Sequence, residues 1–338
     1  MNYNEMLSNA RNKMKLCKAC PVCNGKACGN TIPGPGAKGR GDNAQRNYLA
    51  WQEIRINMDT ICENRDIDTS FELFGKKFVA PIFAGPVAAI NSHYSDYYND
   101  LEYNDIIVRG CKEANICAFT GDGKLDEIMI NACESIKNND GIGIPTIKPW
   151  DIETVKRKMS HANDADAFAI AMDIDAAGLP FLRNNNPPAG SKTVKDLKDI
   201  ISFTNKPFIL KGIMTVKGAL KAIEAGASAI VVSNHGGRVL EDTPATAEVL
   251  EDICKAVNGK VKVLVDGGIR SGADIFKALA LGADGVIIAR PYVTALFGGE
   301  EEGIKLYTEK LRTELEDTMK MCGCFSLKDI KREHIFIK

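Results

Sequence analysis

A regular alternation of two kinds of segment constrains this sequence more than any other feature. From about residue 78 onward, short apolar runs rich in β-forming residues alternate with segments of helical period. The runs lack polar alternation, which is typical of strands buried on both faces in a parallel sheet. There are eight such runs: Val79–Gly85, Ile116–Gly121, Gly143–Ile147, Ala167–Asp173, Phe208–Gly212, Ala229–Asn234, Val261–Gly267 and Gly285–Arg290.

Eight β/α units favour one closed architecture. They fill roughly 210 residues, the size of a (β/α)8 or TIM barrel, and the main alternative is a doubly wound open sheet. The segments between the runs carry helix patterns, as in Thr215–Ala225 and Ala273–Leu281. Gly226 and Gly282 follow these two segments, as the C-termini of helices prefer. We therefore predict an α/β barrel that is followed by a terminal helix over Glu300–Met321.

The N-terminal part has a different character. We expect residues 1–77 to form an extension with a cysteine cluster, and residues 78–338 to form the barrel domain. Two helical stretches, about 3–16 and 43–57, flank a loop rich in cysteine and glycine. The segment Ser70–Phe78 is expected to form a small hairpin under the barrel.

Composition excludes several classes of partner. Lys plus Arg number 43 and Asp plus Glu number 44, so the formal net charge is −1 and there is no broad basic surface for nucleic acid or an anionic membrane. No run approaches the roughly 20 apolar residues of a membrane span, and the first residues lack the apolar core of a secretion signal. We therefore expect a cytoplasmic protein, whose 11 cysteines serve as thiols or metal ligands rather than as disulfides.

Polar residues recur at the C-terminal ends of the predicted strands. In a barrel of this kind, the functional face is the one where the strands end and the loops begin. Charged residues there are costly to bury unless a ligand or partner groups meet them. The polar residues at these ends are Thr120, Asp122, Thr146, Lys148, Asp173, Asp175, Lys211, Asn234, His235, Asp266 and Arg290.

The sixth run ends in the segment Ser233–Arg238, which holds one of only 4 histidines. Imidazole is suited to proton transfer near neutral pH, and the two glycines after it let a substrate approach closely. We predict His235 as a catalytic base and Arg238, whose planar fork matches a carboxylate, as a substrate ligand. Lys211 closes the fifth run, where it could hold a developing negative charge or pair with an acid.

The seventh and eighth runs end in turns that suit a phosphate group. Gly267, Gly268 and Arg270 follow one run, and Ala289 and Arg290 close the other. Loops after these two strands are the usual phosphate site of such barrels, because glycine N–H groups and a helix N-terminus favour an anion. Ordinary βα turn chemistry is the alternative, but two adjacent turns that each carry an arginine favour the phosphate.

Four cysteines crowd the N-terminal loop. Cys17, Cys20, Cys23 and Cys28 lie within twelve residues, and thiolates at such spacing can hold zinc or an iron–sulfur cluster. One gap of four residues departs from the usual ferredoxin spacing. The alternative is a reduced loop whose cysteines pack as small apolar residues.

Several of these motifs together resemble a known enzyme family. Lys211–Gly212, Ser233–Arg238, Asp266–Asp284 and Ala289–Pro291 are similar to the FMN-dependent alpha-hydroxy-acid dehydrogenases and oxidases, the glycolate oxidase and lactate oxidase group. The match covers about residues 205–330. The resemblance implies an FMN-binding barrel that oxidises a small, lactate-like or glycolate-like 2-hydroxy acid to the 2-oxo acid.

The resemblance also implies roles for single residues. His235 removes a proton from the substrate, Asp173 orients the imidazole, Arg238 binds the substrate carboxylate, and Lys211 stabilises the reduced flavin. Whether the α-hydrogen leaves as hydride or as proton stays open. The implied FMN contacts are Gly85, Pro86, Val87, Ala88, Thr120, Thr146, Lys211, Ser233, Asp266, Gly267, Gly268, Arg270, Ala289 and Arg290.

The chain departs from the family pattern near the substrate. The family places a tyrosine at the end of the third strand, where the matching residue here is Ile147, and the stretch Gly29–Gly41 lacks the family's N-terminal tyrosine. Lys148 or Asp122 could supply the missing polar contact. Arg183, on a short fourth loop, is either a second carboxylate ligand or a solvated side chain.

Other functions stay open from the sequence alone. An FMN barrel enzyme of the isopentenyl-diphosphate-isomerase kind and a non-catalytic flavin or metal module that senses redox state are the alternatives. The electron acceptor is open too, because the family contains both oxidases and dehydrogenases. Since barrels of this family often associate, we expect a homo-oligomer.

Overall fold

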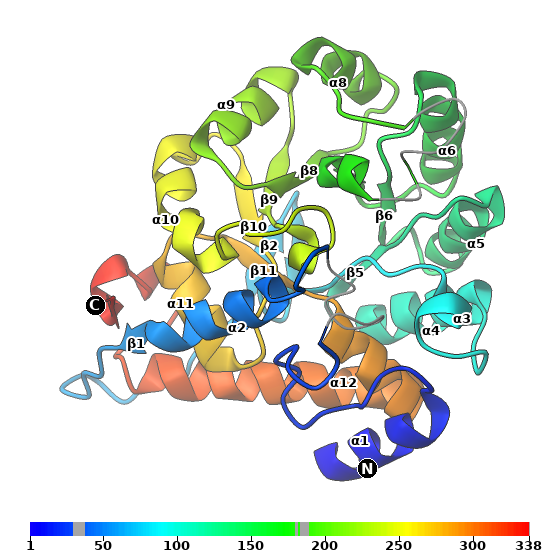
Figure 1. Ribbon diagram of the computed structural model, residues 1–338. Coiled ribbons are helices and arrows are strands. Elements are labelled where there is room, and N and C mark those ends of the chain that lie inside the picture. The colour runs from blue at the N-terminus through cyan, green and yellow to red at the C-terminus, as the bar shows by residue number, and fades with distance from the viewer. Residues whose placement is uncertain (30–37, 180–181, 183–188, 338) are drawn as a thin grey trace.

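The computed structural model describes residues 1–29, 38–179, 182 and 189–337. Eight parallel strands close into a barrel in which β11 pairs with β4, so that Val286 lies beside Ile82. Each strand falls on one of the eight predicted runs, and the TIM-barrel prediction is confirmed (Figure 1). The strands are β4 (Ile82–Ala84), β5 (Cys117–Thr120), β6 (Ile144–Ile147), β7 (Ile170–Asp173), β8 (Phe208–Ile213), β9 (Ala229–Val232), β10 (Lys262–Val265) and β11 (Gly285–Ile288).

Helices surround the strands and follow them in sequence. Their apolar faces and the outward-facing strand residues form one continuous core, as expected when every strand is covered on both sides. The helices that cover the barrel are α4 (Asp100–Glu113), α5 (Asp126–Lys137), α6 (Ile152–Asp164), α8 (Val194–Ile201), α9 (Val216–Ala225), α10 (Thr246–Val257), α11 (Gly272–Ala280) and α12 (Arg290–Lys320).

The terminal helix is longer than predicted. It was expected over Glu300–Met321, but α12 already begins at Arg290, directly after β11. Gly299 and Glu300 interrupt it with non-helical backbone angles. The sequence pattern therefore predicted the part beyond this break and missed the part before it.

A hairpin fills the end of the barrel where the strands begin. It consists of β2 (Phe71–Leu73) and β3 (Lys76–Phe78), as predicted. Phe71 and Phe78 pack edge-on against Phe83 of β4, with ring centroids 6.1 and 5.7 Å away. The barrel interior is therefore a packed apolar core at this end, and a site has room only at the other end.

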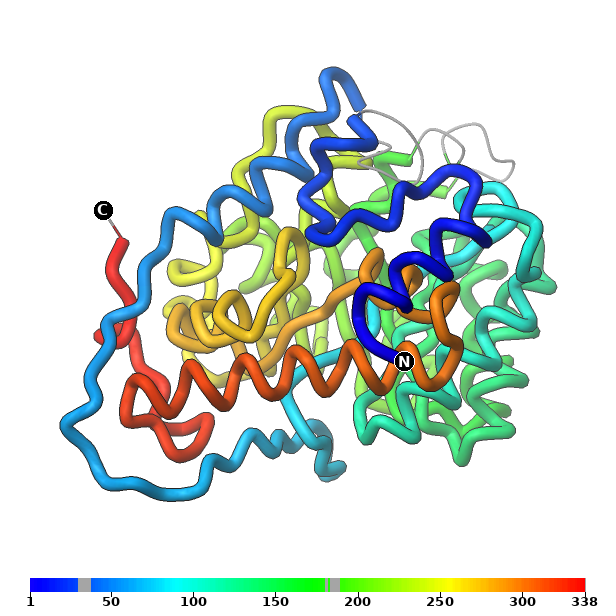
Figure 2. The backbone as a smooth tube through the Cα atoms, turned by 90° about the horizontal axis from the view of Figure 1, so that it is seen from below, coloured from blue at the N-terminus to red at the C-terminus, as the bar shows by residue number. Residues whose placement is uncertain are grey.

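The N-terminal extension forms helices that pack onto the barrel. Helix α1 (Tyr3–Lys13) lies against α12, and the two run side by side in Figure 2. Helix α2 (Asn43–Glu53) packs against α10, α11 and the loop after β9. Both helices are shorter than the predicted stretches. No helix in the described part of the chain has the length and apolarity to cross a membrane.

The remaining elements are short. Strands β1 (Arg55–Ile56) and β12 (Ile335–Phe336) pair near the C-terminus. Helix α3 (Ile90–His93) follows β4. Single-turn helices complete the described structure: η1 (Ile174–Gly178), η2 (His235–Gly237), η3 (Leu327–Asp329) and η4 (Arg332–His334).

Candidate active site

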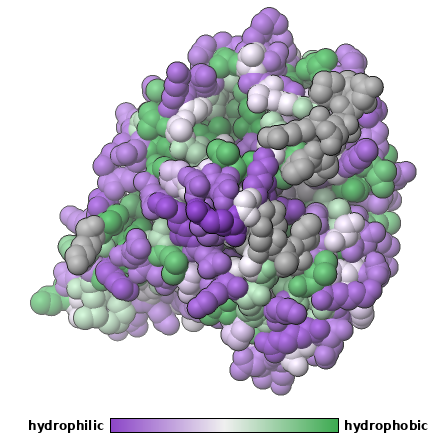
Figure 3. All heavy atoms as spheres, in the orientation of Figure 1, coloured by the Kyte–Doolittle hydropathy of each residue, from purple (hydrophilic) through white to green (hydrophobic). Residues whose placement is uncertain are grey.

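A cavity of about 540 Å³ opens at the C-terminal ends of the barrel strands. Polar residues gather over the middle of the face that Figure 1 presents (Figure 3). The structure brings most of the predicted site residues to this one cavity. Those that line it are Pro86, Val87, Ala88, Thr146, Asp173, Lys211, His235, Arg238, Asp266, Gly267, Gly268, Arg270, Ala289 and Arg290.

Three further predicted residues do not line the cavity themselves. Thr120 ends β5 with its hydroxyl unpartnered. The Ser233 hydroxyl accepts a hydrogen bond from the backbone N–H of His235 at 3.1 Å. Gly85 lets the loop after β4 approach the loop after β11, because a Cβ there would lie 2.8 Å from the Cβ of Ala289. Arg183 lies outside the described residues, so its role as a ligand stays a prediction.

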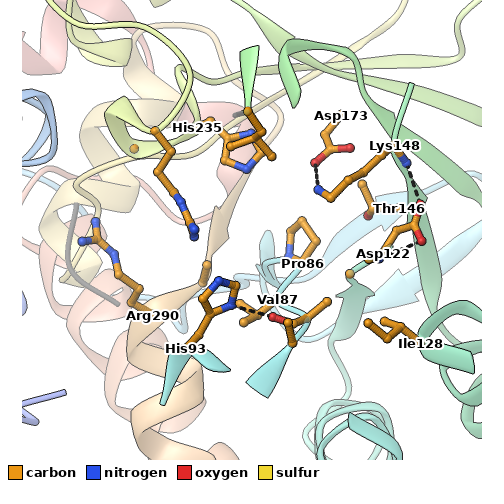
Figure 4. Close-up of a pocket in the computed structure, with 18 of the residues that line it drawn as sticks. Pro86, Val87, His93, Asp122, Ile128, Thr146, Lys148, Asp173, His235 and Arg290 are labelled. Carbon is orange, nitrogen blue, oxygen red and sulfur yellow. Dashed lines mark hydrogen bonds and ion pairs between the residues drawn. The ribbon is translucent and has the colours of Figure 1, made fainter. Parts of the chain in front are cut away.

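His235 sits on an unusual backbone. It has a φ of +56°, and Gly236 and Gly237 follow with +65° and +82°. Three successive left-handed residues reverse the chain after Ser233 and Asn234, which follow β9, and this explains the paired glycines. The turn directs the imidazole into the cavity, where Figure 4 shows it.

The carboxylate that hydrogen-bonds His235 differs from the expected one. The structure places Asp175 Oδ1 3.1 Å from His235 Nδ1, whereas the resemblance implied Asp173. Asp173 Oδ2 instead lies 3.1 Å from Lys148 Nζ. Asp175 belongs to the single-turn helix η1 after β7, which turns its side chain toward His235. Gly212 leaves room for it, since a Cβ there would lie 2.5 Å from Asp175 Cγ.

The charges around this pair keep Asp175 ionised. Burial alone would raise the pKa of Asp175, but His235, Lys211 and Lys148 outweigh it and lower that pKa. A neutral imidazole whose Nδ1–H donates to a carboxylate leaves Nε2 free to accept a proton. The pair is therefore arranged as a general base, His235, and the carboxylate that orients it, Asp175.

Lys211 provides a buried positive charge. Its side chain is 4% exposed, and its Nζ lies 3.4 Å from Asp266 Oδ2 and donates to Ser233 Oγ at 3.1 Å. Burial would lower the pKa of Lys211, but the carboxylates of Asp266, Asp175 and Asp173 raise it. The ammonium is thus a permanent cation that faces the cavity from β8.

Lys148, directly after β6, is the polar side chain that lines the cavity at the end of the third barrel strand, where the family places a tyrosine. Asp122 is not available for a substrate, because its carboxylate accepts from Lys158 Nζ at 2.8 Å and from Trp150 Nε1 at 2.6 Å. It also accepts from the backbone N–H of Lys148. These contacts hold the loop after β6 so that the Lys148 ammonium lines the cavity beside Asp173 (Figure 4).

The opposite side of the cavity is suited to an anion. Gly267 and Gly268 have φ values of +90° and +85°, and Arg270 and Arg290 line the same wall. One guanidinium nitrogen of Arg290, Nη1, is buried without a partner. Backbone N–H groups with two guanidinium groups form the kind of cradle that binds phosphate.

Helix α2 supports both sides of the cavity, which sequence reasoning missed. The side-chain amides of Asn47 and Asn234 exchange two hydrogen bonds of 2.8 and 2.9 Å, next to His235. Trp51 Nε1 donates to the carbonyl of Gly267 at 2.8 Å. A residue on a separate helix carries no local signal for such a role.

His93 is a second residue that the sequence did not single out. It ends α3, lines the cavity and hydrogen-bonds the Ala88 carbonyl through Nδ1 at 2.8 Å (Figure 4). Burial lowers its pKa, and the charge of Arg238 lowers it further. A neutral His93 therefore lies near Arg238, whose Nε is buried and unpartnered.

Unpartnered polar atoms indicate what the cavity accommodates. Among the described residues, nine buried side-chain N or O atoms lack a hydrogen-bond partner. Each such atom costs ~1–3 kcal/mol if it stays unpaired, so a ligand with many polar atoms suits this space. FMN fits, since its ring carries donors and acceptors and its phosphate matches the arginine side. Seven of the nine belong to the strand ends and loops around the cavity: Thr120, Thr146, Asp173, Asp175, Arg238, Asp266 and Arg290.

The four N-terminal cysteines do not form a metal cage. None of the eleven cysteines, all of which lie in described residues, forms a disulfide. Among the described His, Cys, Asp and Glu residues, ligand atoms gather within 4.8 Å at Asp173, Asp175 and His235, and at no group that includes a cysteine. The predicted zinc or iron–sulfur site therefore finds no support in the structure.

Comparison with known sequences points in one direction. The profile of a family described as FMN-dependent dehydrogenase matches residues 35–187 and 183–337. A peroxisomal (S)-2-hydroxyacid oxidase of Arabidopsis thaliana is 48% identical over 321 residues, which cover 86% of this chain and 86% of that protein. The glycolate oxidase of Spinacia oleracea is 47% identical over 179 residues, 53% of this chain and 45% of that protein.

Solved structures extend this likeness to the whole fold. A lactate oxidase of Pediococcus acidilactici gives a TM-score of 0.81 at 25% identity, over 100% of this chain and 95% of that one. A variant of mandelate oxidase with 2-hydroxy-phenylacetamide gives 0.78 at 26% identity, over 99% and 97% of the two chains. The similarity therefore includes the N-terminal extension as well as the barrel.

Proposed function

This chain belongs to the FMN-dependent dehydrogenase family, and we propose that it oxidises a small (S)-2-hydroxy acid to the 2-oxo acid with His235 as the base. One observation carries the proposal. The His235–Asp175 pair, Lys211 and Arg238 surround a single cavity whose other side presents Gly268, Arg270 and Arg290. The names of relatives that match most of this chain, which are (S)-2-hydroxyacid oxidases, support the substrate class.

The residues fit FMN in a defined orientation. FMN, when bound, supplies the acceptor for the two electrons of the substrate. Arg270, Arg290 and the backbone N–H groups of Gly267 and Gly268 would hold its phosphate. The charge of Lys211 would face the bound ligand from β8, where it would stabilise negative charge in a water-poor site.

The remaining residues act on the substrate. Arg238 binds the substrate carboxylate through its unpartnered Nε and the rest of its fork. His235 takes a proton from the substrate through Nε2, and Asp175 stabilises the resulting imidazolium and fixes its orientation. Lys148, held by Asp173, offers a further donor to the substrate oxygens.

The proposal is tested by anaerobic reduction. Lactate, glycolate and mandelate are added in turn to the purified protein, and loss of the visible flavin absorbance is followed. We expect bleaching with at least one of them. His235→Asn should slow bleaching by about 10²–10⁴-fold while FMN stays bound. Colourless protein, or a variant as fast as the wild type, would contradict the proposal.

The acceptor and the compartment belong to the same proposal. Two relatives that match 86% of this chain are named oxidases, which supports molecular oxygen as the acceptor of this chain. Reoxidation in air should then yield one hydrogen peroxide per 2-oxo acid, as measured with a peroxide-specific dye. We place the enzyme in the cytoplasm, although those relatives are named peroxisomal. Microscopy of a tagged full-length chain distinguishes the two.

A homo-oligomer completes the proposal, and it rests on the family resemblance. Light scattering of the purified chain should give a mass of two or more times 36.8 kDa. A monomer at micromolar concentration would contradict it.

A further inference from the structure

The cysteine loop meets the phosphate side of the cavity at one residue. The backbone carbonyl of Cys23 accepts a hydrogen bond from Arg270 Nε at 2.6 Å. The Cys23 Sγ lies 4.0 Å from Arg270 Nη2. Arg270 also lines the cavity, so one guanidinium contacts both the thiol and the expected place of the FMN phosphate.

The pKa of Cys23 is shifted in the opposite direction from the pKa values of the other three cysteines in the loop. Burial would raise the pKa of Cys23, but the charges of Arg270 and Arg290 outweigh it and lower that pKa. Burial raises the pKa of Cys17, Cys20 and Cys28, and a charge on Cys23 raises each of them further. Since the thiolate is the reactive form of cysteine, this difference favours Cys23 as the nucleophile of the loop.

A second cavity borders this cysteine. This cavity, of about 240 Å³, is lined by Cys20 and Cys23 together with Arg270 and Lys310. All four cysteines of the loop are partly exposed rather than fully buried. Cys23 therefore contacts Arg270 and also borders this second cavity.

Thiolate and phosphate compete for the same charges. A phosphate monoester carries a charge of about −1.5 to −2 at neutral pH, and in the proposed orientation it faces Arg270 and Arg290. When it is bound, these guanidiniums are already neutralised and a second anion at Cys23 is disfavoured. Coupling between two sites is reciprocal, so a thiolate at Cys23 also weakens the binding of the phosphate.

We propose that Cys23 is a site of thiol oxidation that is reactive in the flavin-free protein and protected once FMN occupies the arginine pair. The Cys23 thiolate attacks the outer oxygen of a hydroperoxide. An S–O bond forms as the O–O bond breaks, and water or an alcohol leaves, so that sulfur is oxidised and the peroxide is reduced. The Cys20 thiol then attacks the sulfenic acid, which gives a Cys20–Cys23 disulfide and releases water.

The inference rests on the assignment of Arg270 and Arg290 to the FMN phosphate, and its test reads the thiol rather than turnover. Full-length protein is treated with iodoacetamide at neutral pH without flavin, with FMN and with riboflavin, and Cys23 alkylation is followed by mass spectrometry. We expect Cys23 to react at least about tenfold faster without FMN, since one unit of pKa changes the thiolate fraction about tenfold. Riboflavin, which lacks the phosphate, should not protect it.

Variants identify the residues in the peroxide reaction. After hydrogen peroxide, wild-type protein should contain the Cys20–Cys23 disulfide, and Cys20→Ser should instead accumulate sulfenic acid that a dimedone probe traps. Cys23→Ser should abolish both products. Cys62→Ser, which removes an exposed cysteine of the same chain, is the matched control and should change neither. Circular dichroism verifies that each form is folded.

Two results would overturn the inference and leave the proposed function standing. One is equal Cys23 alkylation with and without FMN in a protein that turns over hydroxy acids. The other is equal protection by riboflavin and FMN, which would mean simple shielding. Failure of the full-length chain to bind FMN would overturn both proposals.

Discussion

At the scale of single residues, the sequence predicted the kinds of groups in the site better than their pairing. Residues at strand ends were predicted to converge, and most of them line one cavity. Which aspartate meets His235 was not predictable, because Asp173 and Asp175 lie two residues apart. An extended strand would turn both to one side, but the η1 turn begins after Asp173 and sends only Asp175 to the imidazole.

The two aspartates give a direct comparison. Asp175→Asn should lower kcat by about 10²–10⁴-fold, because an amide neither fixes the right tautomer of His235 nor stabilises its cation. Asp173→Asn should cost less in kcat and act mainly on KM, since it frees Lys148 instead. Steady-state kinetics on both variants decides. Equal losses of kcat, or a larger loss for Asp173→Asn, would contradict Asp175 as the carboxylate that orients His235.

His93 predicts a pH dependence of stability. Its pKa is lowered by burial and by Arg238, so between that pKa and the ordinary value of about 6.5 the unfolded chain binds the proton and the folded chain does not. Stability should therefore fall as the pH drops from about 7 to about 5. The free energy of unfolding of His93→Gln, measured by urea denaturation, should fall less steeply across this pH range. Parallel curves for the two proteins would contradict the assignment.

At the scale of elements, the apolar runs predicted every barrel strand because burial on both faces leaves a clear pattern. The break in α12 at Gly299 and Glu300 was not predictable, since the helix is covered by α1 from a distant part of the sequence. The same holds for α2, whose Asn47 and Trp51 support the loops at His235 and Gly267. Contacts of this kind depend on tertiary packing, which no local pattern records.

The contact between α2 and the phosphate turn can be measured. Gly268 has a φ of +85°, and a Cβ there would lie 2.3 Å from the Asn47 carbonyl oxygen. Gly268→Ala should lower the free energy of unfolding by about 2–5 kcal/mol, from backbone strain and overpacking together.

Gly226 is the matched control for this substitution. It has a φ of +93°, and a Cβ added there would meet no atom within 4 Å, so Gly226→Ala carries only the backbone cost of about 1–2 kcal/mol. Urea denaturation of both variants separates the two contributions. If Gly268→Ala lowers the free energy of unfolding less than Gly226→Ala does, α2 shifts to accommodate the added methyl group.

At the scale of the whole molecule, the extension shares the core of the barrel. Met6, Leu7 and Trp51 are buried and belong to the same apolar cluster as the residues of α11 and α12. A Cβ on Gly298 would lie 2.3 Å from the Met6 carbonyl oxygen, which shows how closely α1 approaches α12. We infer that residues 1–77 and 78–338 fold as one unit.

This inference predicts the behaviour of a fragment. Residues 78–338 expressed alone should lack cooperative urea unfolding, because they expose the apolar surface that α1 and α2 cover and lose the filling of the barrel base. The full-length chain under the same conditions is the reference. A fragment that unfolds cooperatively at the wild-type midpoint would establish two separate domains.

The β2–β3 hairpin has a consequence for traffic through the enzyme. Phe71 and Phe78 pack against Phe83 and close the barrel at the end where the strands begin, so within the described residues the cavity opens at the other end of the barrel. Substrate and product would then enter and leave at the same end of the barrel. Because hydroxy acid and 2-oxo acid would share this cavity, we expect an accumulating 2-oxo acid to compete with the hydroxy acid for it.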